Sequence, residues 1–291
     1  MTPMQSVVAD LDLSFIQLTA LMPAYGRSLE SIRDQPMFAD PFAAMFLQAA
    51  SEHSDVTAGF PAPVLEYFAV RTKFFDETLL KAVRSGCRQV VLLAAGLDAR
   101  AFRLPWPEGT KVFEVDLKPM LTFKDRVLVS QPPQCTRVTV SADLREDWLS
   151  ALAGAGLDTS LPTVWLVEGL LFYLTSEEAD RLLTAIPRAA GSCLTLEHVN
   201  QALLDLIGEL GERLVTRGAP WRSTVDAPAD WLRTLGWNAT VIDQTEAAER
   251  YGRSLPGPQL PDGRTATHWL VDAVAQVGSA DPRARSSPAS T

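Results

Sequence analysis

The chain has 291 residues, 47% of them hydrophobic, with 26 basic and 35 acidic residues and a formal net charge of −9. This length is enough to bury one large core, and no apolar run approaches the roughly 18 residues that a membrane span needs. The acidic balance disfavours a nucleic-acid partner, because a negative surface repels phosphate groups.

Two further features restrict the setting in which the protein works. The first ten residues have no basic segment followed by an apolar run, so no secretion signal is expected. Cys87, Cys135 and Cys193 are widely separated and form no CxxC pair, which predicts neither a disulfide framework nor a metal site. We therefore expect a cytoplasmic protein with free thiols, no bound metal, and a monomeric or homodimeric state.

Residues 1–86 are predicted to form a cap of short helices. Apolar residues recur at helical spacing over 11–22 and 42–49, and prolines separate these stretches. A further amphipathic helix is predicted over 71–83, ending at Ser85 and Gly86.

The pattern then changes, and residues 87–199 are predicted to form the core. Short apolar runs of strand length alternate there with helical stretches. The predicted strands are 89–94, 111–115, 137–140, 163–167 and 193–198, and the helices between them are 120–130, 148–153 and 176–190. This alternation predicts an α/β fold with a doubly wound, mostly parallel sheet.

The C-terminal third continues with a predicted helical lid and two last strands. A long amphipathic helix over 200–217 and the loop after it form the lid insertion, residues 200–228. The final segment, residues 229–279, holds a helix at 230–235, a strand at 238–243 and a strand at 267–273, the last predicted to be antiparallel at a sheet edge. Residues 280–291 have almost no apolar bulk and are predicted to be disordered.

The loop at 94–103 follows the first strand directly, where an open α/β sheet binds its ligands. Gly96 lets the backbone approach a ligand that a Cβ would keep away. A dinucleotide would require G-x-G-x-x-G, and here Ala94 and Ala99 flank the single glycine. S-adenosylmethionine carries no phosphates and needs fewer glycines, so the loop favours this methyl donor over a nicotinamide dinucleotide.

Acidic residues follow three later strands. Asp116 lies 20 residues after Gly96 and suits the two ribose hydroxyls of an adenosine, although it could instead cap the next helix. Asp143 could accept from an adenine amino group, with the backbone of Leu144 beside it, or serve as an N-cap. Glu168 would be costly to bury unpaired, so it needs a cationic donor group or a salt bridge to an arginine.

These segments resemble the leucine carboxyl methyltransferase family. The resemblance rests on residues 93–104, 112–116, 142–148 and 167–174, with Asp40-Pro41 and residues 71–76 in the N-terminal part, and it spans 19–273. The similarity is to the bacterial branch, which includes the tetracenomycin polyketide carboxyl O-methyltransferase and actinobacterial S-adenosylmethionine-dependent methyltransferases. It implies a class I methyltransferase fold, a Rossmann-like, doubly wound seven-stranded sheet with an N-terminal helical cap and an inserted helical lid.

The resemblance also implies which residues hold the donor. By matching position these are Arg71, for the methionine carboxylate, together with Ala94, Gly96, Asp116, Asp143, Leu144 and Glu168. Arg27 corresponds more loosely to a basic cap residue. The family usually has glycine where this chain has Ala94, so that residue is a departure that could weaken donor binding.

The acceptor is predicted from the scarcity of bases. Of His53, His198 and His268, only His198 is expected to face the site, and Tyr173 is a second candidate catalytic residue. A carboxylate is already ionised at neutral pH and needs no base, whereas a phenol or alcohol benefits from one. We therefore expect O-methylation of a small-molecule acid, such as a polyketide or other secondary metabolite.

Several alternatives stay open at this point. The acceptor could be a hydroxyl or a peptide C-terminal carboxylate, or the chain could be a non-catalytic scaffold that binds the donor. A nicotinamide oxidoreductase is disfavoured by the missing glycines and by the lack of a Tyr-x-x-x-Lys motif. The acceptor pocket is expected between the cap and the lid, with Tyr25, Phe38 and Trp221 as apolar walls.

Overall fold

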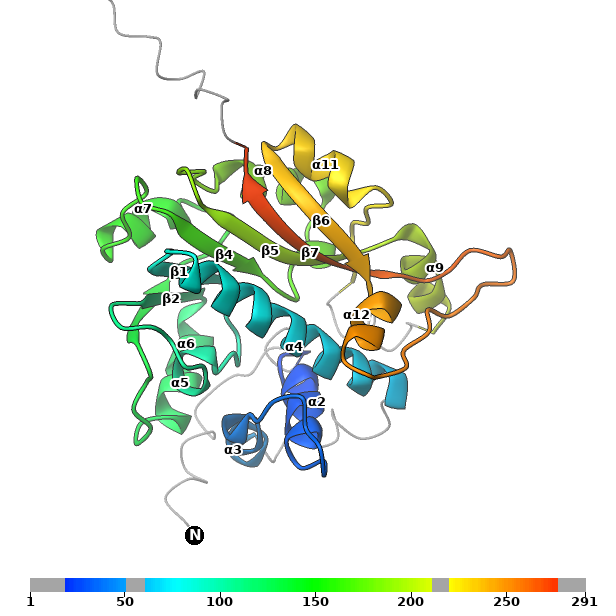
Figure 1. Ribbon diagram of the computed structural model, residues 1–291, viewed down its shortest axis with the longest axis horizontal. Helices are drawn as coiled ribbons and strands as arrows, with labels where there is room; N and C mark the ends of the chain where they lie inside the picture. Colours follow the sequence, from blue (N-terminus) through cyan, green and yellow to red (C-terminus); the bar gives the residue numbers. More distant parts are fainter. Residues whose placement is uncertain (1–18, 51–60, 211–219, 277–291) are drawn as a thin grey trace, which may run out of the picture.

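The computed structural model describes residues 19–50, 61–210 and 220–276. They form a seven-stranded sheet in the order β3-β2-β1-β4-β5-β7-β6 (Figure 1). The strands are Gln89–Leu93 (β1), Lys111–Asp116 (β2), Thr136–Ser141 (β3), Thr163–Val167 (β4), Cys193–Val199 (β5), Trp237–Asp243 (β6) and His268–Ala275 (β7). β1 pairs in parallel with both β2 and β4, so the strand order reverses beside it. The predicted α/β fold is confirmed, and the reversal marks the ligand-binding end of the sheet.

The last strand, β7, differs from its prediction in one respect. It is antiparallel as expected, but it lies between β5 and β6 rather than at an edge. The edge is formed by β6 instead. Leu270 and Val271 are both fully buried and belong to the cores on opposite faces of the sheet. A strand that buries both of its faces is better placed inside a sheet than at its rim, which explains the difference.

Helices cover both faces of the sheet, and alternate strand residues contact the two layers. On β1, Val90 and Leu92 join one core, and Val91 and Leu93 join the other. The first face carries α2 (Leu21–Ser31), α3 (Pro41–Ala49), α4 (Ala62–Arg84), α5 (Arg100–Arg103), α6 (Lys118–Val127) and α12 (Gln244–Arg250). The second carries α7 (Trp148–Gly154), α8 (Ser176–Ala185) and α11 (Pro228–Thr234). Figure 1 shows α4 running across the first face, with α2 and α3 outside it.

The helical cap is tied closely to α4. A Cβ on Gly26 of α2 would lie 2.9 Å from the Cβ of Phe68 on α4, so a larger residue would push the two helices apart. Helix α3 begins at Pro41, and the side chain of Asp40 accepts a hydrogen bond from the Ala43 N–H at 3.1 Å. This packing holds the inner faces of α2 and α4 near the carboxyl ends of the strands.

The remaining helices agree with the prediction in part. α8 starts after Thr175 with a capping box between Thr175 and Glu178, as its acidic first turn predicts. α9 covers Gln201–Leu210, and the rest of the helix predicted over 200–217 lies outside the described residues. α12 was not predicted, although Asp243 caps it by accepting from the Glu246 N–H at 2.8 Å. The tail predicted to be disordered, residues 280–291, also lies outside the described part.

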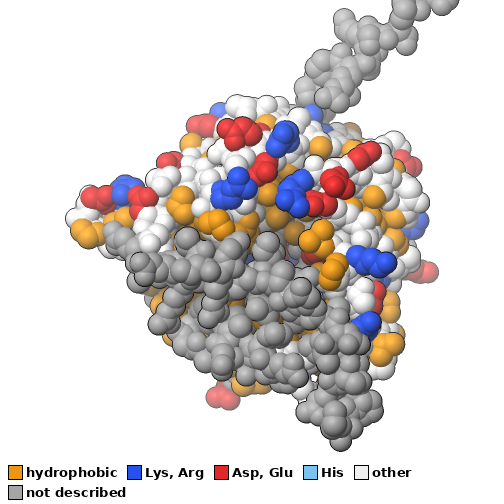
Figure 2. Space-filling view, turned by 180° about the vertical axis from the view of Figure 1, so that it is seen from behind, with side chains coloured by type: hydrophobic (Ala, Val, Ile, Leu, Met, Phe, Trp, Pro, Cys, Tyr) orange, Lys and Arg blue, Asp and Glu red, His pale blue; other side chains and the backbone are white. Residues whose placement is uncertain are grey.

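The described surface carries charges of both signs. Figure 2 shows Lys and Arg side chains interspersed with Asp and Glu over the described part of one face, rather than gathered into a patch of one sign. No helix in the described ranges is long and apolar enough to cross a membrane.

Candidate functional site

A cavity of about 1330 Å³ opens at the carboxyl ends of the parallel strands. Strand-end residues of β1, β2, β4 and β5 line one side, and residues of α2, α4 and α9 line the other. Ligand pockets for one drug-sized molecule measure roughly 300–1,000 Å³. The volume here is larger than that range, so the cavity has room for two small molecules.

The structure brings most of the predicted site residues together around this cavity. Its lining includes the predicted donor residues Arg27, Arg71, Ala94, Gly96, Asp116, Asp143, Leu144 and Glu168, as well as Tyr173. His198 does not line it. The polar residues gather at the strand ends of β1, β2 and β4.

The loop between β1 and α5, residues 94–99, is held by Asp116 at the end of β2. One carboxylate oxygen of Asp116 accepts from the Gly96 N–H at 2.7 Å, and the other accepts from the Leu117 N–H at 2.7 Å. Each oxygen keeps a further lone pair for a ligand hydroxyl. Burial raises the pKa of Asp116, opposed by these backbone N–H groups. Asp116 therefore shapes the loop and presents an acceptor beside it.

Two residues of this loop adopt the left-handed backbone conformation. Gly96 has φ +44° and Ala94 has φ +54°, and Ala94 is the only described residue other than glycine with positive φ. Glycine reaches this region freely, whereas an L-residue with a Cβ pays about 1–2 kcal/mol. The residue that departs from the usual family sequence thus sits at a position where the backbone favours glycine.

We expect Ala94→Gly to stabilise the protein slightly. Relief of the left-handed conformation exceeds the extra unfolded-state freedom of glycine, for a net gain of up to about 1 kcal/mol and a Tm increase of about 1–3 °C. Thermal unfolding of the purified variant measures this. The matched control is Ala95→Gly, at a neighbour without positive φ, which should lower the Tm. An equal decrease in both variants would contradict the expectation.

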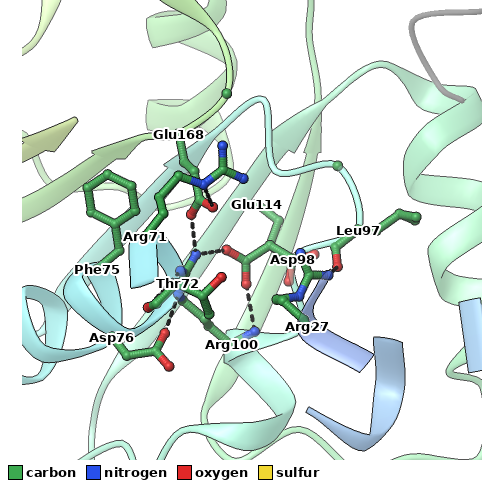
Figure 3. A network of polar contacts seen from close by, with 12 residues as sticks. Arg27, Arg71, Thr72, Phe75, Asp76, Leu97, Asp98, Arg100, Glu114 and Glu168 are labelled. Carbon is green, nitrogen blue, oxygen red and sulfur yellow. Dashed lines mark hydrogen bonds and ion pairs between the residues drawn. The ribbon is translucent and has the colours of Figure 1, made fainter. Parts of the chain in front are cut away.

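Beneath the loop lies a buried ionic network centred on Arg100 (Figure 3). The Arg100 guanidinium binds Asp76 through Nε at 2.7 Å and Glu168 through Nη1 at 2.7 Å, and it also contacts the carboxylate of Asp98. Although burial raises the pKa of Asp98, the charge of Arg100 lowers it to about 2. Arg103 adds two hydrogen bonds to Asp76, at 2.6 and 2.7 Å. The network joins α4, the loop and the end of β4.

A second ionic cluster, around Arg71 of α4, adjoins the first. Arg71 lies between two carboxylates, with Nε 2.9 Å from Glu168 and Nη1 2.7 Å from Glu197. Glu197, at the end of β5, also accepts from the Gly169 N–H at 2.5 Å and from the hydroxyl of Tyr67. From the sequence, Glu168 was expected to pair with a cationic group of the donor or with an arginine. The salt bridge to an arginine is present. Arg71 is thereby fixed at the cavity wall.

Arg27 braces the loop from the cap. Its Nε binds Asp40 at 2.7 Å, and its Nη2 donates to the carbonyl oxygen of Leu97 at 2.8 Å. The guanidinium is buried and still lines the cavity. Two of its hydrogen-bonding sites are thus used by the protein, and the arginine connects α2 with the loop.

Asp143 lies at the cavity edge beyond β3. Its carboxylate accepts from the Arg145 N–H at 2.9 Å and pairs with the Arg145 guanidinium. The side-chain hydrogen bond from Arg145 is the main reason that the pKa of Asp143 is lowered. The N-cap of α7 is Asp147, which accepts from the Ser150 N–H at 3.2 Å. Asp143 is therefore not the helix cap that the sequence left open for it.

His198 lies on the opposite face of the sheet from the cavity. Its Nδ1 accepts from the Val199 N–H at 2.9 Å, and its ring contacts Trp231 edge-on, with the centroids 5.6 Å apart. Side chains alternate along a strand, so Glu197 and Val199 face the cavity side while His198 faces α11. The expected catalytic role of His198 does not fit this position, because the side chain does not line the cavity.

We expect His198 to make the free energy of unfolding depend on pH. Burial lowers the pKa of His198 to about 4, from 6.5. Between these values the unfolded chain binds a proton that the folded chain does not, so the free energy of unfolding falls as pH decreases from 6.5 to 4. At pH 4.5 this one residue contributes a loss of about 2–3 kcal/mol. Urea unfolding at pH 7 and pH 4.5 should show a smaller loss in His198→Phe, and an unchanged loss would contradict the assignment.

Of the two histidines in the described part of the chain, His268 is the one that lines the cavity, and it was not expected there. It is the first residue of β7 and pairs with Val199 of β5, so the two share the cavity side, while Trp269 pairs with His198. Its ring stacks on Tyr67, with centroids 3.7 Å apart and planes at 23°. Period-two alternation along β5 and β7 was the signal that could have found it, but the register between the strands was needed as well.

Aromatic rings form the wall around His268. The ring centroid of Phe172 lies 4.3 Å from that of Trp221 and 4.7 Å from that of Tyr173. Burial raises the pKa of Tyr173, which polar contacts with Trp221 and Thr19 oppose, so its hydroxyl stays protonated at neutral pH. Trp221 lines the cavity as expected, but Phe38 and Tyr25 do not. The guanidinium carbon of Arg103 instead lies 5.3 Å from the centroid of the Phe38 ring.

The polar residues at the strand ends of the cavity suit the chemical groups of S-adenosylmethionine. An adenosine needs a ribose acceptor and an adenine partner, which Asp116 and Asp143 offer, and the amino-acid part needs a cation and an anion, which Arg71 and Glu168 offer. A Cβ on Gly96 would have its nearest contact at 3.7 Å, on the Ala20 side chain, so the backbone there is open to a ligand.

Comparison with protein families supports this reading. Residues 20–187 match the family described as leucine carboxyl methyltransferase, which is more than half of the chain. A protein of Parafrankia sp. (strain EAN1pec), named for S-adenosyl-L-methionine-dependent methyltransferase activity, is 42% identical over 257 residues, covering 82% of each chain. A protein of Streptomyces coelicolor with the same kind of name is 39% identical and covers 90% of this chain and 96% of its own.

Solved structures agree in fold. A DUF574 family protein from Streptomyces avermitilis has a TM-score of 0.56 at 16% identity, covering 86% of this chain and 96% of that chain. A protein from Thermobifida fusca whose structure is described as that of a methyltransferase has a TM-score of 0.56 at 18% identity, with 87% and 94% coverage. At these identities the likeness extends to the fold alone.

Proposed function

This chain belongs to the leucine carboxyl methyltransferase family and is an S-adenosylmethionine-dependent methyltransferase. We propose that it methylates an oxygen atom of a small-molecule acceptor, and that this oxygen belongs to a carboxylate group. The proposal divides the cavity into two parts. The polar strand ends hold the donor, and the apolar part between α2, α4 and α9 holds the acceptor.

The donor part uses the residues around the β1–α5 loop. Asp116 would bind the ribose hydroxyls, Asp143 and the Leu144 backbone the adenine, and Arg71 with Glu168 the carboxylate and amino group. When bound, the donor supplies an electrophilic methyl group on a sulfonium. The chain's own contribution is to orient both partners and to exclude water, because an in-line displacement depends chiefly on alignment. Arg27 supports this by holding the Leu97 carbonyl.

The acceptor part is mostly apolar. Its walls come from the cap, from the turn after β4, from α9 and from the segment after it, and include Met22, Val64, Phe172, Leu203, Ile207 and Trp221. Tyr173 joins this wall as a packing residue. Such a lining favours an apolar or aromatic acceptor body with one polar end, as in a polyketide or another secondary metabolite.

One observation favours a carboxylate as the methylated group. The imidazole of His268 is the candidate base nearest to the acceptor walls, and burial, with the charge of Arg71, lowers its pKa to about 3. The hydroxyls of Tyr67 and Tyr173 also have raised pKa values. With so low a pKa, the His268 imidazole is a weak acceptor of a phenol or alcohol proton, and the two protonated tyrosines are no bases either. A carboxylate acceptor is ionised without a base.

A hydroxyl acceptor is the second candidate, and His268 is the observation that favours it. The ring is neutral, it lines the cavity and no described group forms a hydrogen bond with its Nε2, so it has an unused site to which a hydroxyl proton could be donated. The two candidates differ in how the rate depends on pH. The carboxylate needs no proton removal, whereas the hydroxyl reacts faster as more of it ionises.

The test is a matched panel of aromatic acids and phenols, incubated with S-adenosylmethionine and analysed by mass spectrometry for methyl ester or methyl ether. We expect esters, with a kcat/KM that is constant between about pH 6 and pH 9 because the acid is already ionised. Ethers formed at a rate that rises with pH would favour the hydroxyl candidate. Methylation of a peptide C-terminus in preference to the small acids would replace the small-molecule proposal.

A further inference from the structure

His268 occupies a defined place beyond the donor residues. Starting from Glu168, the contacts run through Arg71 to Glu197, from Glu197 to the hydroxyl of Tyr67, and from the Tyr67 ring to the imidazole. The imidazole is thus connected to Glu168 through Arg71, Glu197 and Tyr67. Its other neighbour is Trp221, whose ring meets it edge-on at 78° with centroids 6.4 Å apart.

The hydrogen-bonding capacity of this ring is not used by the described protein. The backbone N–H of His268 donates to Gln244 at 2.8 Å, but this does not involve the imidazole. Nδ1 is enclosed by the protein and has no hydrogen-bond partner, no described group bonds to Nε2, and the residue lines the cavity. The imidazole therefore has unused hydrogen-bonding capacity at the cavity wall, and Nε2 is the nitrogen through which a ligand in the cavity would complete it.

The electrostatic surroundings favour an anion at this point. The positive charge of Arg71 reaches the imidazole strongly enough to contribute to its lowered pKa. The nearest carboxylate in the chain of contacts, Glu197, is already compensated by Arg71, the Gly169 N–H and the Tyr67 hydroxyl. A ligand carboxylate at this point would therefore accept from a neutral N–H donor, and the charge of Arg71 would favour its binding.

Resting on the proposed function, we propose that His268 is the specificity-determining residue of the acceptor site, and that it binds the ionised oxygen of an acidic acceptor by donating a ring N–H. Tyr67 holds the imidazole in place through stacking, and Glu197 holds Tyr67 through its hydroxyl. His268 thereby selects an anionic acceptor group over a neutral one of the same shape.

The test uses binding, so that it does not depend on turnover. The probes are 2-naphthoate and its neutral counterpart 2-naphthamide, titrated calorimetrically into the protein saturated with S-adenosylhomocysteine. We expect the wild type to prefer naphthoate by about 10-fold to 100-fold, the factor expected from one hydrogen bond to a charged group. His268→Phe, which keeps the stacking on Tyr67 but has no N–H, should lose this preference and bind both probes alike.

Two further variants separate recognition from structure. His268→Gln keeps an N–H donor and should retain part of the preference. His198→Phe alters the histidine on the other face of the sheet and should retain all of it. Affinity for S-adenosylhomocysteine should stay within about twofold in all three variants, because none of these side chains belongs to the donor residues.

Three outcomes would overturn the inference: a naphthoate preference that persists in His268→Phe, a wild type that binds the two probes equally, or a wild type that does not bind naphthoate at millimolar concentrations. Failure of the proposed function appears differently. It would show as no affinity for S-adenosylhomocysteine, or as His268-dependent naphthoate binding without any methyl ester formed from S-adenosylmethionine.

Discussion

Asp116→Ala should weaken the binding of S-adenosylhomocysteine by about 100-fold or more. The substitution removes the ribose acceptor and also the two backbone hydrogen bonds, to Gly96 and Leu117, that shape the β1–α5 loop. Hydrogen bonds to a charged group contribute about 1.5–3 kcal/mol each, and a factor of 100 needs only about 2.7 kcal/mol. Isothermal titration calorimetry of the purified variant measures the effect.

The control for this substitution is Asp143→Ala at the cavity edge. Asp143 is more exposed and already pairs with Arg145, so its loss should cost less affinity, about 10-fold or below. Circular dichroism should show that Asp116→Ala is folded, because Asp116 lies at a strand end rather than in the core. Donor-product affinity that is unchanged in a folded Asp116→Ala protein would remove Asp116 from the donor site.

The second large effect is expected for Arg100→Met. Arg100 is only 3% exposed and compensates Asp76, Asp98 and Glu168 together. Removing one partner of a buried ionic network leaves uncompensated charges and typically costs about 3–5 kcal/mol, which for a domain of this size lowers the Tm by about 5–10 °C. Differential scanning calorimetry, or the yield of soluble protein if the variant does not fold, measures this.

The matched control is Arg145→Met, which removes another arginine–carboxylate pair. The Arg145 side chain is 70% exposed, and exposed pairs contribute at most about 1 kcal/mol. Its Tm should therefore stay within about 2 °C of the wild type. Similar Tm values for both variants would show that the Arg100 network does not hold the loop.

Much of the fold could be predicted because local patterns and burial agree along β1, β2, β4 and β5. The runs 89–94 and 163–167 became β1 and β4 within a residue of their predicted ends, since each is a continuous apolar segment buried on both faces. The place of β7 could not be predicted in the same way. Whether a strand lies inside or at the edge of a sheet depends on pairing with residues far away in the chain.

The residues of the candidate site also fall into those that local sequence patterns predict and those that depend on contacts between distant segments. The position of Asp116 and Glu168 at the cavity could be predicted from the sequence, because each follows or ends a predicted strand and parallel strands bring their ends together. His268 was missed, and His198 was placed on the wrong face, because this distinction depends on a single residue of register between β5 and β7. Arg100 was passed over because its three carboxylate partners come from α4, the loop and β4, which only tertiary packing brings together.

Calorimetric titration of the wild-type chain with S-adenosylhomocysteine tests the central claim most directly, with NAD titrated in parallel. We expect one saturable site with micromolar affinity for S-adenosylhomocysteine and no response to NAD, because the loop has the acceptor for a ribose but not the glycines for a pyrophosphate. Binding of NAD would contradict the donor assignment. The absence of binding by either ligand would mean that the strand-end site of this chain does not hold a methyl donor.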